Sequence, residues 1–228
     1  MKDQNQAPAT PSSKPDWVGA MLGHPRFEFT ARLCTGNTQK MRLIAKHLPT
    51  CTVVELEICG IGNADLSASR IELCEKMVAA MLEAGLVDHG SSQFSRLLRC
   101  EYANRLIEVI SSYGCGYFYS RKHDTVARLS FNRRVYLHDA CGVVIEAKAA
   151  GKWKGFSYGG TLRNLVLQMR NYVMRGERID PAYLGIDLQR TDTNVWGYSP
   201  EQMRLCRRAA QKLPIMNAPA AMDLERAA

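Results

Sequence analysis

Apolar and polar residues along the chain follow two periods, and these periods divide it into strands and helices. Residues 27–31 alternate between apolar and polar side chains, which predicts a strand. The β-branched run over 52–59 predicts another strand. Between them, an Asn-Thr capping pair and the break at Pro49 predict a helix over 38–48.

Apolar side chains with a period of 3.6 residues predict helices in four other places. Glycine ends three of these segments, and a Ser-Pro pair opens the fourth, as is typical of helix ends and starts. The predicted helices run from residue 63 or 65 to 84, over 92–113, over 162–175 and from 200 to about 212.

The middle of the chain has short aromatic or β-branched runs that predict a series of antiparallel strands. Residues 139–142 have the composition of a turn. The predicted strands lie at 117–120, 125–131, 135–138 and 143–148, with a further one at 153–156. The fold class is therefore α+β, an antiparallel meander with hairpins and flanking helices, together with a small α/β first half.

These elements suggest four parts of the chain. Residues 1–15 are rich in Pro, Ser and amides and are expected to form a disordered arm. A small α/β half is expected over 16–90 and a basic α+β half over 91–213. Residues 214–228, rich in Ala and polar side chains, are expected to be a flexible tail.

Length and composition place the protein among ordinary globular chains. It has 228 residues, of which 46% are hydrophobic and 23% charged, so a sizeable core is expected. Its apolar runs are far shorter than the ~20 residues that span a bilayer. The first 16 residues lack the apolar segment of a secretion signal. We therefore expect a cytoplasmic protein without a membrane partner, and the composition is compatible with a homo-oligomer.

The charge of the chain is concentrated in one region. The net charge is +8, and residues 94–176 hold 14 basic and five acidic residues, which gives +9 there and −1 elsewhere. Clustered positive charge is the first sign of a nucleic-acid partner, DNA or RNA. A basic surface kept for solubility is the alternative. Within this region, the candidate contacts with nucleic acid include Arg121, Lys122, Arg133, Arg134 and Arg170.

The eight cysteines give no sign of a metal site. No two of them are closer than eight residues, so the CxxC spacing of zinc sites is absent from the sequence. Without a signal peptide, we expect reduced and mostly buried thiols. The sequence predicts no metal and no cofactor.

The segment over 152–165 predicts an anion site. Two lysines and an aromatic pair precede a Gly-Gly-Thr turn, and a helix follows directly. Free backbone N–H groups and the macrodipole at a helix N-terminus favour an anion. A capped helix, with Thr161 or Ser157 as its N-cap, explains the same pattern. The predicted anion-binding residues are Lys152, Lys154, Ser157, Gly159, Gly160, Thr161 and Arg163.

The part of the chain from the hairpin at Val135 through Gly176, which includes WKGFSYGGTLRNLV, resembles uncharacterised proteins of bacterial mobile elements. The resemblance covers about 40 residues and brings no named activity with it. It implies an accessory protein of a plasmid, phage or island.

A strand that ends in Glu146-Ala-Lys148 after Asp139 resembles the metal-dependent PD-(D/E)xK nucleases. In those enzymes a pair of carboxylates holds Mg²⁺ and the lysine stabilises developing charge. The pattern departs at one point, because the aspartate should lie on the preceding strand, where Arg133 and Arg134 stand. We therefore expect no catalytic residue and a degenerate nuclease at most.

The leading hypothesis is a non-enzymatic accessory protein of a mobile element that binds nucleic acid through its basic second half. The first alternative is an inhibitor that binds a nucleic-acid-processing protein complex, of the anti-defence (such as anti-CRISPR) or fertility-control kind. The second alternative is the nuclease. Salt-dependent binding to generic DNA or RNA distinguishes the first two hypotheses.

Overall fold

The computed structural model describes residues 22, 24–33, 40–59, 66–86, 92–113, 118–148, 160–184 and 196–218. Contacts divide the chain into two compact units, residues 1–91 and 92–228. The predicted disordered arm over 1–15 and the predicted strand over 153–156 lie outside the described residues.

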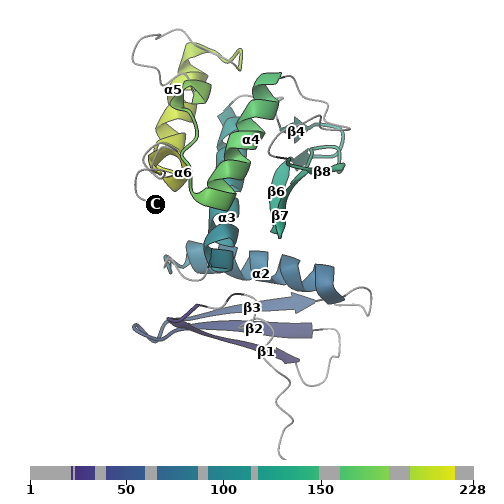
Figure 1. Cartoon of the computed structure of the whole chain (residues 1–228), viewed down its shortest axis with the longest axis vertical. Helices are drawn as coiled ribbons and strands as arrows, with labels where there is room; N and C mark the ends of the chain where they lie inside the picture. Colours follow the sequence, from purple (N-terminus) through teal and green to yellow (C-terminus); the bar gives the residue numbers. More distant parts are fainter. Residues whose placement is uncertain are drawn as a thin grey trace, which may run out of the picture. The chain divides into compact units, whose positions relative to one another are not determined.

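The first unit is an antiparallel sheet with one helix. Its strands are β1 (Phe27–Leu33), β2 (Lys40–His47) and β3 (Val53–Cys59), and β2 lies in the middle. Helix α2 (Leu66–Glu83) packs on β2 and β3 (Figure 1). The predicted strands over 27–31 and 52–59 and the predicted helix before Gly85 are confirmed.

The helix predicted over 38–48 is wrong, because this segment forms strand β2. Leu43 and Ala45 are fully buried and lie opposite Ala31 and Phe29 of β1. Hydrogen bonding to a strand on each side outweighs the local helix signal, since propensity is only a weak preference. The first unit is consequently α+β, with strands that are all antiparallel, rather than the α/β half that was expected.

The two faces of this sheet differ in chemistry. One face carries Phe27 and Phe29, both buried. On the other face Arg42 of β2 pairs with Glu55 and Glu57 of β3, at 3.8 Å in each case. All three side chains are about half exposed, so these ion pairs contribute little to stability.

The second unit is built around one long helix, α3 (Ser92–Tyr113), whose bounds match the predicted helix over 92–113. Helix α4 (Gly160–Arg175) packs beside α3, and α5 (Pro200–Ala210) and α6 (Pro214–Asn217) contact it as well (Figure 1). Its strands are β4 (Tyr119–Ser120), β5 (Thr125–Val126), β6 (Arg128–Asn132), β7 (Arg134–His138) and β8 (Val144–Glu146).

These strands form two antiparallel sheets, β4-β5 and β6-β7-β8, which confirms the predicted hairpins and the α+β class. Strand β6 packs on α3, and strand β7 contacts α4. One face of the sheet β6-β7-β8 lies in the core, because its side chains are buried: Leu129, Val135, Leu137 and Ile145.

A buried amide joins α3 to β6. Asn104 of α3 donates from Nδ2 to the carbonyl of Leu129 at 2.9 Å, and its Oδ1 accepts the Leu129 N–H at 2.7 Å. One side chain therefore satisfies both backbone groups of a buried strand residue, which would otherwise carry a large desolvation cost.

A second polar contact lies at the C-terminal end of α4. Arg99 of α3 donates from Nε to the carbonyl of Val173 at 2.9 Å, and from Nη2 to that of Met174 at 3.5 Å. Carbonyls in the last turn of a helix lack partners within the helix, and an arginine is a favourable one. Burial lowers the pKa of Arg99. One of the 14 basic residues of the charged region thus has a structural role.

Gly176 follows α4 in the left-handed region, at φ +81°. Only glycine adopts this conformation without strain, so we expect Gly176→Ala to lower the free energy of unfolding by about 1 kcal/mol. Denaturant unfolding of the two proteins measures the difference. Arg175→Ala, at the preceding exposed position, is the control and should change stability by less than about 0.5 kcal/mol. Equal stability of Gly176→Ala and the wild type would contradict this account of the helix end.

The C-terminal part of the unit begins with the short 3₁₀ helix η1 (Pro181–Leu184). Ser199 then caps α5, because its hydroxyl accepts the N–H of Gln202 while the Gln202 side chain accepts the N–H of Ser199. The predicted Ser-Pro start is confirmed. The segment expected to be a flexible tail from residue 214 onward begins instead with α6, which buries Ile215 and Met216.

Five cysteines of the described part of the chain are free thiols. Cys74, Cys100 and Cys206 are buried, and Cys51 and Cys141 are exposed. Burial raises the pKa of Cys206 to about 11, so its thiol stays protonated and packs as a small apolar group.

Candidate nucleic-acid interface

The second unit has a pocket of about 310 Å³ whose basic lining residues come from three places in the sequence. It lies where β7, β8 and the residues after β8 meet α4. Four of its lining residues are basic and one is acidic. The residues that line this pocket, called the basic pocket below, are Arg133, Arg134, Val135, Glu146, Ala147, Lys148, Arg170 and Met174.

The hairpin of β6 and β7 and the end of β8 position one side of the pocket. Val135 and Ala147 are buried, and the N–H of Ala147 donates to the carbonyl of Val135 at 2.8 Å. This bond continues the pairing of β7 and β8 past the end of β8. It therefore fixes the backbone next to Lys148, whose side chain is exposed at the pocket.

Helix α4 forms the other side. Met169 and Val173 face the core and are fully buried, whereas Arg170 and Met174 are only partly buried and line the pocket. Arg170 donates to the Oδ1 of its neighbour Asn171 at 3.1 Å, an exchangeable contact between polar side chains near the surface. The predicted amphipathic stripe of this helix thus places one arginine at the pocket.

Arg163 extends the same flank of α4. It precedes Arg170 by seven residues, which is close to two helical turns and roughly 10 Å. Residues spaced by seven lie on one side of a helix, so Arg163 lies on the flank that carries Arg170 and Met174. Its side chain is half-buried.

One ion pair reduces the charge of the pocket. Arg134 donates from Nη1 to Oε1 of Glu146 at 2.9 Å. Glu146 lies opposite Tyr136 in the register, so the two charged residues are diagonal neighbours on the same face of the sheet. The described lining of the pocket then has a net charge of +3, which comes from Arg133, Lys148 and Arg170.

Arg133 stands in an unfavourable backbone conformation. It connects β6 and β7 with φ +58°, in the left-handed region that favours glycine or asparagine. An arginine there costs on the order of 1 kcal/mol, and its side chain is exposed, so it gives no packing in return. Strain of this kind is common at residues that serve function rather than stability.

The structure does not bring Arg121 and Lys122 to the basic pocket. Both are exposed in the turn between β4 and β5. Thr125 of β5 donates to the carbonyl of Ala140 at 2.8 Å, which places this hairpin near the turn after β7. Arg133 precedes β7, and the five residues of that strand separate its two ends by roughly 13 Å.

The anion site predicted from residues 152–163 lies almost wholly outside the described residues. Lys152, Lys154, Ser157 and Gly159 are not described, and neither is the side chain of Thr161. Gly160 is the first residue of α4. The role of this segment stays a prediction, and of its residues only Arg163 is placed near the basic pocket.

The two carboxylates of the nuclease-like pattern, Asp139 and Glu146, have other partners in the structure. The buried Asp139 accepts the N–H groups of Cys141 and Val143 at 2.9 and 2.8 Å through one oxygen and so holds its own turn. Its position is three residues along β7 from the partner of Glu146, roughly 10 Å. In the part of the chain that the structure describes, no three His, Cys, Asp or Glu residues are grouped to hold a metal ion.

His138, at the end of β7, gives the unit a pH dependence. Its Nε2 is 2.7 Å from the hydroxyl of Ser130, and burial, followed by the nearby Arg128, lowers its pKa below the ordinary 6.5. The unfolded chain therefore binds a proton at this residue more readily than the folded chain does.

Stability from this residue is consequently complete above pH 6.5 and is lost as the pH falls through and below that value. We expect the melting temperature of the wild type to fall more between neutral and mildly acidic pH than that of His138→Gln, which can keep a hydrogen bond to Ser130 but cannot be protonated. Parallel melting curves over this range test the prediction. Equal slopes in the two proteins would show that His138 does not contribute.

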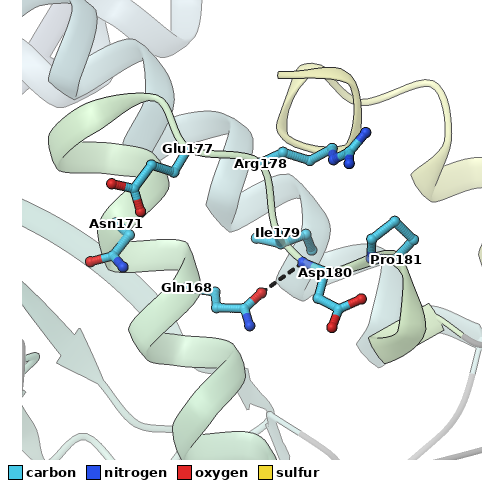
Figure 2. A pocket seen from close by; sticks show the side chains of 7 residues that line it. All are labelled: Gln168, Asn171, Glu177, Arg178, Ile179, Asp180 and Pro181. Atoms are coloured by element: carbon cyan, nitrogen blue, oxygen red, sulfur yellow. Dashed lines mark hydrogen bonds between the residues drawn. The ribbon is translucent and has the colours of Figure 1, made fainter. Parts of the chain in front are cut away.

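A second pocket, of about 370 Å³, lies on the opposite flank of α4 and has different chemistry. Figure 2 shows Gln168 accepting the N–H of Asp180 at 2.7 Å, which ties the chain after α4 to the helix. Among the described residues that line it, Arg178 is the one cation, and Glu177 and Asp180 carry negative charge. The polar groups there are used to hold the backbone, so the basic pocket is the better candidate.

Sequence patterns named three of the four described cations of the basic pocket, Arg133, Arg134 and Arg170, as candidate contacts but missed Lys148 in that role and missed the apolar lining. Val135, Ala147 and Met174 were assigned only to strands and a helix, because periodicity reports which face is buried and not what the rim encloses. The left-handed backbone at Arg133 had one weak signal, the Asn-Arg pair at a hairpin turn.

A protein-family model described as YoqU matches residues 92–222, more than half of the chain and nearly all of the second unit. No curated protein and no solved structure matches the chain. The described helices include none that is long and apolar enough to cross a membrane.

Proposed function

The chain belongs to the YoqU family, and we propose that the unit matched by this family binds nucleic acid through the basic pocket and the adjoining flank of α4. The protein would act as a non-enzymatic accessory protein of a bacterial mobile element, in line with the resemblance of residues 135–176. The observation that supports binding most directly is the convergence of Arg133, Lys148 and Arg170 on one concavity.

Electrostatics favours a polyanion over other partners. Four cations and one carboxylate line the pocket, and Arg163 adds charge along α4. Arginine and lysine in such a cluster bind phosphates and release the counterions that surround a nucleic acid. The strain at Arg133 adds support, because the exposed side chain does nothing for folding that would offset it.

Binding to short single- and double-stranded DNA and RNA, followed by fluorescence anisotropy over about 50 to 200 mM salt, tests the proposal. We expect the logarithm of affinity to fall linearly with the logarithm of salt concentration, with a slope of about −0.9 for each phosphate neutralised on duplex DNA. Absence of salt-dependent binding at low salt to all four nucleic acids would overturn the proposal. It would favour the alternative of an inhibitor that binds a nucleic-acid-processing complex.

Arg133→Gly separates binding from folding. The change removes a cation from the pocket and also relieves the left-handed strain, so the variant should be as stable as the wild type or about 1 kcal/mol more stable. Nucleic-acid affinity should nevertheless fall, and the salt slope should become shallower by about 1. Anisotropy and denaturant unfolding measure the two effects.

Arg121→Gly is the matched control, because it removes an exposed arginine near the other end of β7. It should leave affinity nearer the wild-type value than Arg133→Gly does. Equal affinity of the wild type and Arg133→Gly would place the binding surface elsewhere on the unit.

A further inference from the structure

The cations of the basic pocket come from three separate elements, an arrangement that a surface for an unbroken nucleic-acid backbone does not require. Its lining takes cations from the β6–β7 turn, from the residues after β8 and from α4, and it includes the buried Val135 and Ala147. A groove that follows a strand would place its cations in a row. Here they line one small concavity from three elements, which suits a group that ends in the pocket.

We propose that the basic pocket binds the terminal phosphate of a nucleic-acid strand, a phosphomonoester, in preference to phosphodiesters within the strand. This inference rests on the proposed function and states which part of a nucleic acid the site selects. Three properties of the site indicate this ligand: the charge of its lining, its volume, and the non-aromatic character of the lining residues that the structure describes.

Charge favours the phosphomonoester. A terminal phosphate carries about −1.5 to −2 at neutral pH and three acceptor oxygens, whereas an internal phosphodiester carries about −1. Glu146 already balances Arg134, which leaves Arg133, Lys148 and Arg170 for the ligand. Three cations match a dianion with several acceptors better than a monoanion, and each charge-assisted hydrogen bond strengthens the preference.

Size and lining agree with this ligand. A pocket of about 310 Å³ has the liquid volume of roughly ten waters, at the small end of the range for ligand sites. It has room for a phosphate and the sugar next to it but not for several nucleotides. None of the lining residues that the structure describes is aromatic, so these residues offer no platform on which a base could stack. Recognition should therefore be independent of the terminal base.

The test compares one oligonucleotide sequence with a 5′-phosphate, a 3′-phosphate or hydroxyls at both ends, bound to the full-length protein at a fixed salt concentration. We expect a phosphate at one of the two ends to tighten binding about tenfold or more. Changing the terminal base should have little effect. The end at which the phosphate tightens binding shows whether the pocket takes a 5′-phosphate or a 3′-phosphate.

The preference should depend on the pocket. Arg170→Gln and Arg133→Gly should each reduce the gain from the terminal phosphate several-fold, and Arg121→Gln, outside the pocket, should preserve it. Equal, salt-dependent binding of all three oligonucleotides would overturn this inference and leave the proposed function intact. Absence of binding to all of them would overturn both. A terminal-phosphate gain that survives in Arg170→Gln and Arg133→Gly would move its site away from the basic pocket and so also overturn the inference.

Discussion

Asn104→Ala is expected to lower the free energy of unfolding of the second unit by about 3 kcal/mol. The substitution removes both hydrogen bonds to Leu129 and leaves a buried N–H and a buried C=O without their partner. Each unsatisfied buried group costs about 1–3 kcal/mol, so the effect exceeds that of an ordinary lost side-chain contact. Denaturant unfolding followed by circular dichroism measures it.

Asn132→Ala is the control, because it removes an exposed amide from the same strand, β6. It should change stability by less than about 0.5 kcal/mol. A loss of similar size in the two variants would mean that the bonds of Asn104 to β6 are not what stabilises the contact between helix and strand.

Phe118→Ala is expected to have the other large effect, a loss of about 4 kcal/mol. The ring is fully buried, and its centre is 6.4 Å from the Trp196 ring. The carbonyl of Phe118 also accepts the N–H of Ala127 at 2.6 Å, a contact that alanine keeps. The loss should therefore come from the cavity rather than from the backbone.

The backbone at Phe118 allows a sharper test. Its φ of +61° is in the left-handed region, where a residue with a Cβ atom is strained. Burial of the phenylalanine ring offsets this strain, whereas an alanine would keep the strain and lose the burial. Phe118→Gly should consequently be about 1 kcal/mol more stable than Phe118→Ala, the reverse of the usual order. Val126→Ala, at a partly exposed position of β5, should cost less than about 1 kcal/mol. A Phe118→Gly variant less stable than Phe118→Ala would contradict the strain.

The sequence predicts long helices well, but it does not show whether a short apolar segment forms a helix or a strand. The stripe over 92–113 repeats for six turns and ends in glycine, so local pattern alone determines α3. The segment Lys40–His47 carries helix-end signals, but its pairing with both β1 and β3 makes it a strand. That pairing joins segments distant in sequence, which periodicity does not report.

The candidate site shows the same limit. Arg133, Arg134 and Arg170 were each predicted as nucleic-acid contacts, but their grouping with Lys148 was not. Lys148 and its neighbour Glu146 had been assigned to a nuclease-like pattern, because a short motif on one strand is easier to see than a pocket shared by a hairpin and a helix. The charge excess indicated the half of the chain that holds the basic pocket, whereas the position of each cation depends on tertiary packing.

The amide of Asn104 has a consequence for how the protein behaves at high concentration. Strand β6 is the first strand of its sheet, and an outer strand usually offers free N–H and C=O groups to strands of other molecules. At Leu129 those groups are already bound within the same chain. The strand at the other border, β8, has only three residues, so it offers another chain a short edge. The sheet β6-β7-β8 is therefore protected on both borders against the strand-by-strand growth that leads to aggregation.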